Sequence, residues 1–266
     1  MHDKVVFITG ATSGLGLSTA KHLQSLGFKV YGTGRNPRGD HSFELIKMDV
    51  RDQNSIENAI SYVLSKEKTI DILINNAGIG ITGSIEDTPT EGMREVFETN
   101  FFGAIEMMKA VLPQMRKQKK GLIINVTSIA GYMGLPFRAI YSASKGALEL
   151  VTEALRMEVK TFGIHIANVA PGDFATNIAS GRVTTEIQEE SAYAITYKKS
   201  LDLMDAHVDQ GGDPILFAKA IEKIIKKESP AIHYKVGSFL QKFSIVLKRI
   251  LPDKWYERML MNHYDL

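Results

Sequence analysis

Cysteine is absent from this chain of 266 residues, and tryptophan occurs only once. Without cysteine the protein has no disulfide, no thiolate nucleophile and no cysteine-ligated zinc or iron–sulfur centre. The absence of disulfides suits a reducing compartment, and we expect a cytoplasmic protein. No apolar run approaches the roughly 20 residues that cross a bilayer. The N-terminus leads directly into a strand-like segment, so no signal peptide is expected.

A charge excess of either sign is also lacking. The chain has 32 basic and 30 acidic residues and a formal net charge of +2. This balance gives no overall positive field, so we expect no nucleic-acid partner. No histidine pair has metal-ligand spacing with a carboxylate nearby, so no metal site is predicted. The hydrophobic share of 44% is that of an ordinary soluble globular protein.

Short apolar runs alternate with longer amphipathic segments over the first two-thirds of the chain. Strands are predicted at residues 5–8, 28–31, 45–48, 70–74, 122–126 and 164–169. Helical spacing of apolar residues occurs at 15–26, 56–63, 91–117 and 141–161. This alternation predicts an α/β fold of the Rossmann type, a doubly wound parallel sheet with helices on both faces. No linker or repeat divides the chain, so residues 1–266 are predicted to form a single domain.

The pattern changes after the sixth strand. Residues 173–212 have few long apolar runs, which is typical of a lid or binding loop over a substrate. Asp213-Pro214 then predicts the start of a helix that continues to Lys227, because aspartate caps helices and proline suits their first position. Residues 231–236 are predicted to form a late strand.

A glycine-rich turn separates the first predicted strand from the first predicted helix: Thr9-Gly10-Ala11-Thr12-Ser13-Gly14-Leu15-Gly16. Glycines at this point let the backbone approach a pyrophosphate, and the helix N-terminus offers free N–H groups. A turn that serves packing alone is the alternative. The spacing differs from the Gly-x-Gly-x-x-Gly of other dinucleotide-binding folds.

Further motifs follow this turn in a fixed order. They are Asn75-Asn76-Ala77-Gly78 after the fourth strand, Asn100, Ser128 after the fifth strand, Tyr141-Ser142-Ala143-Ser144-Lys145, and Pro171-Gly172 after the sixth strand. Together with the glycine turn they resemble the short-chain dehydrogenase/reductase family over about residues 4–172.

This resemblance implies a catalytic tetrad of Asn100, Ser128, Tyr141 and Lys145. Tyr141 and Lys145 are four residues apart on a helix and share one face, and a lysine ammonium beside a phenol favours the phenolate. Tyr141 is therefore predicted to exchange a proton with the substrate, and Ser128 to hold the substrate oxygen. In the family the lysine also binds the nicotinamide ribose, and the asparagine positions a water that links this lysine to solvent.

The resemblance also implies a set of cofactor-binding residues. Asp49 and Val50 are expected at the adenine, and Thr176 at the nicotinamide carboxamide or the pyrophosphate. The whole expected set is Gly10, Thr12, Ser13, Gly14, Leu15, Gly16, Arg35, Asp49, Val50, Asn76, Ala77, Gly78, Tyr141, Lys145, Pro171, Gly172 and Thr176.

The end of the second strand indicates which cofactor is used. An acidic residue there would bind the ribose 2′-hydroxyl of NAD, but the chain has Thr33-Gly34-Arg35-Asn36. Arg35 can pair with a 2′-phosphate, so NADP(H) is predicted over NAD(H). An exposed arginine without a partner is the alternative. Ser13 stands where NADP-preferring members often have a second basic residue.

Residues 238–266 form an amphipathic tail. Apolar side chains recur at helical spacing on both sides of Pro252-Asp253. The tail contains five basic and three acidic residues. Three interpretations remain open: helices packed on the core or a neighbouring subunit, a cap over the substrate pocket, or a basic interfacial helix on an anionic membrane. We expect the tail to border the pocket, with Phe239, Leu240 and Phe243 as its first apolar side chains there.

These observations predict an NADP(H)-dependent oxidoreductase that moves a hydride between nicotinamide and a carbonyl or alcohol carbon. A bulky apolar substrate resembling a steroid, retinoid or lipid is expected, and membrane contact through the tail is compatible with it. The alternatives are a non-catalytic dinucleotide-binding redox sensor and a membrane-associated scaffold. Family members often pair their helices across a two-fold axis, so a homodimer or homotetramer is expected. Leu148, Val151, Leu155 and Val159 supply a helical apolar stripe for core or subunit contacts.

Overall fold

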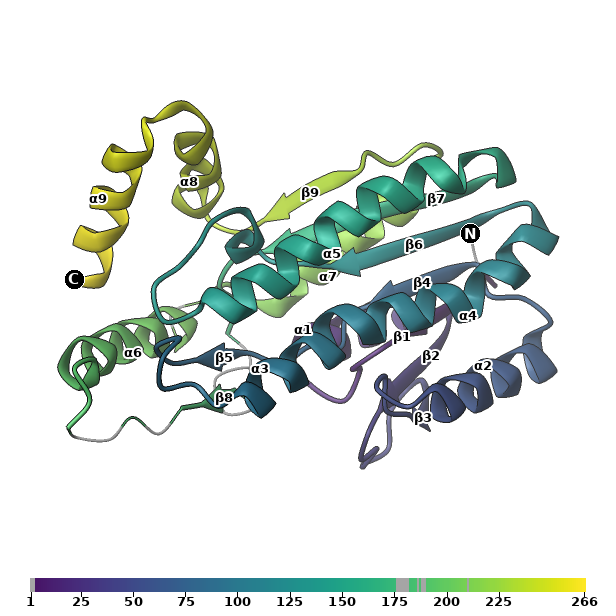
Figure 1. Cartoon of the computed structure of the whole chain (residues 1–266). Helices are drawn as coiled ribbons and strands as arrows, with labels where there is room; N and C mark the ends of the chain where they lie inside the picture. The colour runs from purple at the N-terminus through teal and green to yellow at the C-terminus, as the bar shows by residue number, and fades with distance from the viewer. Residues whose placement is uncertain (1–2, 176–181, 186, 188–189, 210) are drawn as a thin grey trace.

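The structure, a computed structural model, describes residues 3–175, 182–185, 187, 190–209 and 211–266, without the side chains of 207–209. Seven parallel strands form the central sheet in the order β3-β2-β1-β4-β6-β7-β9 (Figure 1). The strands are β1 (Val5–Ile8), β2 (Lys29–Gly34), β3 (Glu44–Lys47), β4 (Ile72–Asn75), β6 (Gly121–Val126), β7 (Ile164–Pro171) and β9 (His233–Val236). The predicted doubly wound sheet is confirmed, and the late strand extends it beyond β7.

Each face of the sheet is covered by its own helices. In β1, Val5 and Phe7 pack on one face and Val6 and Ile8 on the other, as alternation along a strand requires. The first face carries α2 (Gln53–Glu67), α4 (Gly103–Gln118) and α5 (Ala139–Glu158), and the second carries α1 (Gly14–Ser25) and α7 (Pro214–Ile225). Burial on both faces explains why the strands are continuous apolar runs.

The segment predicted as one long helix is interrupted by a wider turn. It consists of α3 (Thr90–Phe97), the π-helical turn η1 (Glu98–Phe102) and α4. Asn100 lies in this π-helical turn and is buried. Single π-turns within α-helices occur often at functional sites, because they redirect side chains that a regular helix would hold elsewhere.

The region after β7 contains more structure than a loop. It includes β8 (Val183–Thr184), which pairs in parallel with β5 (Ile81–Thr82), and the helix α6 (Ala194–Asp209). Among the side chains of α6 that the structure describes, Tyr197, Ser200 and Met204 are buried. Because a serine occupies the middle of this buried stripe, the apolar periodicity was too weak to predict the helix from sequence.

Two short 3-10 helices complete the sheet layers, η2 (Ile129–Tyr132) after β6 and η3 (Lys160–Phe162) before β7. The apolar stripe of α5 faces inward: Leu148 and Val159 are buried in the core, and Val151 and Leu155 pack against it. This stripe therefore supplies core contacts. Asp213 caps α7 by accepting a hydrogen bond from the Ile215 N–H, as predicted.

The tail forms two helices, α8 (Phe239–Ile250) and α9 (Asp253–Tyr264), beyond the end of β9 (Figure 1). Ser238 and Gln241 form a capping box at the start of α8. Ile245 of α8 and Tyr256 of α9 pack with Ile129 and Met133, next to the sheet. The tail is thus held by a small apolar cluster of its own.

The expectation that Phe239, Leu240 and Phe243 of the tail border the pocket is wrong. Phe239 is 73% exposed, Leu240 75% and Phe243 40%. They face solvent because Ile245, on the other side of α8, is the side chain that enters the cluster below. No helix in the described part of the chain is both long and apolar enough to cross a membrane.

Replacing Ile245 by alanine tests the attachment of the tail. This side chain is 1% exposed, and its truncation should cost about 3 kcal/mol of unfolding free energy through lost burial and a residual cavity. The neighbouring Val246 is 44% exposed, and Val246→Ala should cost less than about 1 kcal/mol. Urea unfolding of both variants measures the difference, and equal losses would contradict this packing.

Candidate active site

A cavity of about 300 Å³ opens at the carboxyl ends of the central strands. Because all of these strands are parallel, the segments that follow them meet at this one edge, where α/β sheets place ligands. It is lined by the following residues: Gly10, Thr12, Ser13, Gly14, Leu15, Thr33, Gly34, Arg35, Met48, Asp49, Val50, Arg51, Asn76, Ala77, Gly78, Ile79, Thr99, Val126, Thr127, Tyr141, Lys145 and Pro171.

The glycine turn after β1 is packed too tightly for side chains. A Cβ on Gly16 would lie 2.3 Å from the Gly10 carbonyl oxygen, and Gly10 itself has φ +67°, which favours glycine. The Asn76 side-chain amide donates to the carbonyl oxygens of Thr9 and Gly10, at 3.0 Å each. The loop after β4 thereby fixes the turn after β1.

The N-terminus of α1 faces the cavity. Its capping residue, Ser13, makes no side-chain hydrogen bond to the first turn. The first-turn N–H groups are therefore available to a phosphate, and the helix dipole favours negative charge at this end. These features fit the pyrophosphate of a dinucleotide.

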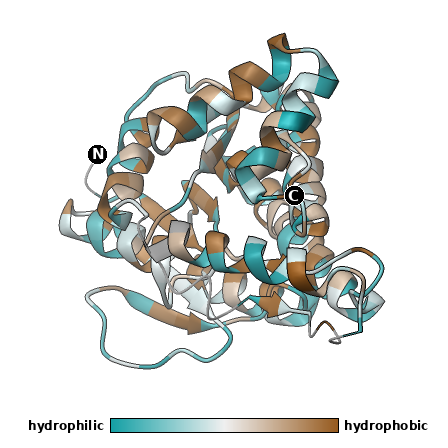
Figure 2. Cartoon of the chain, turned by 90° about the vertical axis from the view of Figure 1, so that its left-hand side faces the viewer, coloured by the Kyte–Doolittle hydropathy of each residue, from teal (hydrophilic) through white to brown (hydrophobic). Residues whose placement is uncertain are grey.

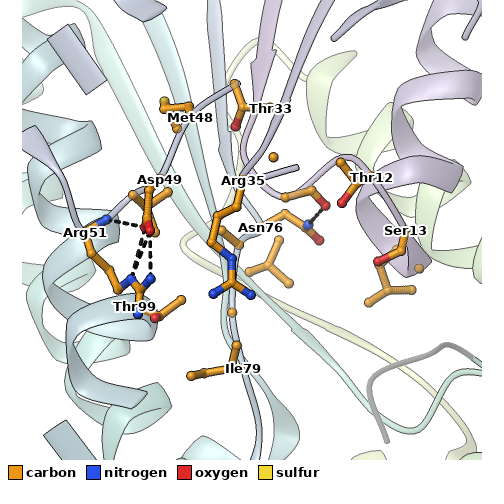
Figure 3. A pocket seen from close by; sticks show the side chains of 18 of the residues that line it. Thr12, Ser13, Thr33, Arg35, Met48, Asp49, Arg51, Asn76, Ile79 and Thr99 are labelled. Atoms are coloured by element: carbon orange, nitrogen blue, oxygen red, sulfur yellow. Dashed lines mark hydrogen bonds and ion pairs between the residues drawn. The ribbon is translucent and has the colours of Figure 1, made fainter. Parts of the chain in front are cut away.

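Asp49, Arg51 and Arg35 line the cavity, and Figure 3 shows Arg35 between the Asp49–Arg51 pair and the turn that carries Thr12 and Ser13. Arg51 holds Asp49 through a fork with contacts of 2.8–3.2 Å and also pairs with Glu95 at 2.9 Å. The hydrogen bond from Arg51 holds the pKa of the Asp49 carboxyl below its usual value. The Arg35 guanidinium extends into the cavity, and among the described residues no carboxylate forms an ion pair with it.

Tyr141 and Lys145 project from the first turns of α5, where both side chains are buried. The Lys145 ammonium donates to the Val126 carbonyl oxygen at 3.0 Å, at the end of β6. Burial lowers the pKa of Lys145 to about 8. Lys145 therefore remains mainly cationic near neutral pH and presents its charge to the cavity.

Asn100 organises the loop after β4. Its side-chain oxygen accepts from the Ile79 N–H at 2.8 Å, and its amide donates to the Ile79 carbonyl oxygen at 2.9 Å. A Cβ on Gly78 would lie 3.1 Å from the Asn100 oxygen and 3.2 Å from the Lys145 nitrogen. Asn100 thus borders Gly78 and lies behind the cavity wall, with its amide atoms engaged by the backbone.

A second cavity of about 80 Å³ adjoins the first. It is lined by Leu15, Gly80, Ile81, Thr82, Ser128, Arg138, Tyr141, Pro171, Gly172, Asp173, Phe174, Arg182 and Met204. Tyr141 and Leu15 line both cavities. Tyr141 therefore stands between the larger cleft and a smaller pocket that contains Ser128, which is the arrangement that proton transfer to a substrate requires.

Charged groups of the second cavity are partly neutralised. Arg182 pairs with Asp205 of α6 at 3.0 Å, and the Arg138 guanidinium lies 5.5 Å from the Tyr141 ring centroid. The Asp173 carboxylate accepts a hydrogen bond from the Gln241 side chain of α8 at 2.7 Å. The tail therefore touches the pocket through a polar contact, which replaces the expected apolar wall.

Most of the predicted site residues meet at these two cavities. Gly16 lies beneath the glycine turn, Gly172 lines the second cavity, and Thr176 lies outside the described residues. Of the residues that line the larger cavity, the expected set lacked Thr33, Gly34, Met48, Arg51, Ile79, Thr99, Val126 and Thr127. Of these, Arg51 had a usable signal, since it directly follows the predicted adenine contact Asp49-Val50.

The family model described as short chain dehydrogenase matches residues 4–187. The chain belongs to this family. A 3-ketodihydrosphingosine reductase of Bacteroides thetaiotaomicron is 38% identical over the full length of both chains. The dehydrogenase/reductase SDR family member 7B of Mus musculus is 35% identical, with 97% of this chain and 81% of that protein covered.

A solved short-chain dehydrogenase of Streptomyces avermitilis superposes with a TM-score of 0.81 and 30% identity. The superposition covers 98% of this chain and 97% of that one, so it includes the helical tail. As a member of this family, the protein is an oxidoreductase that acts on alcohol and carbonyl groups with a nicotinamide dinucleotide.

The glycine turn provides a direct test of the larger cavity. Gly16→Ala places a methyl group against the Gly10 carbonyl, and we expect cofactor affinity to fall at least about tenfold as the turn shifts. Gly134→Ala is the matched control, because a Cβ there meets nothing within 4 Å. Fluorescence titration of the reduced cofactor measures both, and an unchanged affinity in Gly16→Ala would show that the turn does not hold it.

Proposed function

We propose that this enzyme uses NADPH to reduce the ketone of a long-chain lipid, with 3-ketodihydrosphingosine as the first compound to test. The observation that carries the reaction is the position of Tyr141, which lines both the larger cleft and the pocket that contains Ser128. The lipid class is supported by the name of the Bacteroides relative, which matches over its whole length. The sequence predicted a substrate of the steroid, retinoid or lipid class, and the name of this relative favours a lipid substrate.

Each residue of the site has its own role in this reduction. NADPH supplies the hydride when bound in the larger cavity. Ser128 holds the ketone oxygen, and Tyr141 donates a proton to it as the alcohol forms. Lys145 binds the nicotinamide ribose and presents a buried positive charge to the cavity that Tyr141 also lines. Asn100 fixes the loop against which Lys145 rests, and by family resemblance it positions a water that returns protons to the site.

The pocket also offers a partner for a polar headgroup. In 3-ketodihydrosphingosine an amino group is attached to the carbon next to the ketone, and its ammonium form needs an anionic partner once water is excluded. Asp173 lines the same pocket as Ser128 and Tyr141. Leu15, Ile81, Phe174 and Met204 offer apolar contacts to the carbons nearest the ketone.

A substrate panel with a proton-transfer variant tests the reaction. NADPH oxidation should be fastest with 3-ketodihydrosphingosine, slower with a long-chain ketone that lacks the amino group, and slowest with a short-chain ketone. Tyr141→Phe keeps the ring and removes the proton, so kcat should fall by about 10²-fold or more with cofactor affinity retained. Unchanged turnover in this variant would contradict the role of Tyr141. Cofactor binding without turnover on any carbonyl compound would favour a redox sensor.

The preference for NADPH rests on the charges around Arg35. Asp49 also lines the cavity, but Arg51 neutralises it through the fork described above. Arg35 extends into the cavity at the end of β2 as a cation that no described carboxylate neutralises. Dinucleotide-binding folds bind the 2′-phosphate at this point. A bidentate arginine–phosphate pair supplies both affinity and orientation.

Arg35→Asp should reverse this preference, because a carboxylate repels the 2′-phosphate and accepts hydrogen bonds from a free ribose. We expect the ratio of kcat/KM for NADPH over NADH to fall by at least about 100-fold, which corresponds to the loss of one charge-assisted pair and its replacement by repulsion. Arg38→Asp makes the same charge change three residues away at a side chain that does not line the cavity. A wild-type preference for NADH, or an equal shift in both variants, would contradict the proposal.

Assembly and location complete the proposal. Homodimers or homotetramers would form through the outer sides of α4 and α5. Leu150 on α5 is 68% exposed and Phe102, just before α4, is 46% exposed, and such side chains suit a subunit contact. Light scattering reports the oligomeric state. The absence of cysteine supports a reducing, cytoplasmic location.

A further inference from the structure

The outer side of α8 is apolar although it faces solvent. We call Phe239, Leu240, Phe243, Val246 and Ile250 the α8 face; their exposed fractions are 73%, 75%, 40%, 44% and 66%. Four of these residues recur at intervals of three or four, which places them on one side of the helix. The Phe239 and Phe243 rings stack with centroids 5.6 Å apart, so they form one continuous apolar surface.

Basic side chains border the α8 face. The helix contains Lys242, Lys248 and Arg249 and no acidic residue. Lys242 and Arg249 are exposed and, on the helical wheel, both lie next to the apolar stripe. Within the described part of the chain, neither forms an ion pair with a carboxylate. Charge complementarity therefore favours an anionic partner.

We propose that the α8 face docks on the surface of a lipid bilayer that contains anionic lipids. Helices that lie in the membrane interface combine large apolar side chains on one face with lysine and arginine beside them, as α8 does. Trp255, 70% exposed at the start of α9, adds an aromatic side chain of the kind enriched at bilayer interfaces. The proposal does not depend on the identity of the substrate.

A second copy of the chain is the weaker occupant. A two-fold contact between α8 faces would bring the basic residues of one copy close to those of the other, and this helix has no acidic residue to pair with them. An anionic bilayer instead attracts those same charges, at short range and in a salt-dependent manner.

Docking through α8 would bring the substrate pocket close to the bilayer. Gln241 of α8 hydrogen-bonds to Asp173, which lines that pocket. Figure 1 shows α8 and α9 at the end of the sheet to which the strands point, and the site lies at these carboxyl ends. Figure 2 views the molecule from this end, and the helices there carry both hydrophobic (brown) and hydrophilic (teal) residues. A lipid ketone could then pass from the membrane to the pocket over a short path.

Vesicle sedimentation with the full chain tests the proposal. The protein should bind vesicles of phosphatidylglycerol and phosphatidylcholine in equal parts, more weakly at high salt, and bind pure phosphatidylcholine poorly. Phe239→Ser with Ile250→Ser should weaken binding to the anionic vesicles at least about tenfold, because the apolar anchor is lost. Leu216→Ser with Tyr62→Ser is the matched control, since those side chains are 55% and 40% exposed on α7 and α2, away from the proposed subunit contact.

Charge reversal provides an independent test of vesicle binding. Lys242→Glu with Arg249→Glu should reduce binding to anionic vesicles at least about tenfold, whereas Lys21→Glu with Lys160→Glu makes the same net change elsewhere and should reduce it much less. Turnover of a short-chain ketone should be unchanged in all four variants, which separates failed docking from a failed active site. No binding by the wild type, or equal losses in variants and controls, would overturn the proposal. It would also be overturned if the α8 variants only split an oligomer in light scattering.

Discussion

The close approach of the turn after β1 to the start of α1 determines the geometry of the whole site. Gly10 and Gly16 allow backbone atoms to meet where any side chain would collide, and the Asn76 amide binds the carbonyl oxygens of this turn. One asparagine therefore joins the segments that follow two neighbouring strands. With the turn fixed, the first N–H groups of α1 point into the cavity, and the backbone itself can bind a phosphate without a cationic side chain.

Burial of Lys145 has an energetic consequence that extends beyond catalysis. Its pKa falls from 10.5 to about 8 on folding, so between these values the unfolded chain binds more protons than the folded one. The contribution of this group to stability therefore rises with pH through that window and is lowest below about pH 8. Below about pH 8, Lys145 carries the positive charge that the site uses, and in the same pH range its burial destabilises the fold most. Active sites often combine function with such a loss of stability.

The sequence was sufficient for the sheet and for most of the site because both depend on local patterns. Strand residues are apolar on both faces, and Ser128, Tyr141 and Lys145 lie at fixed distances from strand and helix starts. Features that depend on distant contacts escaped prediction. The Asp173–Gln241 bond joins side chains 68 residues apart, and the buried stripe of α6 contains Ser200 in place of an apolar residue. Neither can be inferred from spacing alone.

The direction of α8 illustrates how such contacts select a surface. Gly172 and Gly237 leave room for the Gln241 side chain, which a Cβ on either glycine would meet at 2.1 Å and 2.7 Å. Once Gln241 and Ile245 face inward, helical geometry turns Phe239, Phe243 and Ile250 outward.

The fold does not require those outward positions to be apolar. The outer side of α2 in the same molecule exposes Gln53, Asn54, Glu57, Asn58 and Ser61. An outward face that is polar on α2 and apolar on α8 reflects different surroundings, because exposed apolar side chains gain free energy only when something removes them from water. The inward contacts of α8 thus fix its orientation, and the composition of its outer side points to a partner outside the chain.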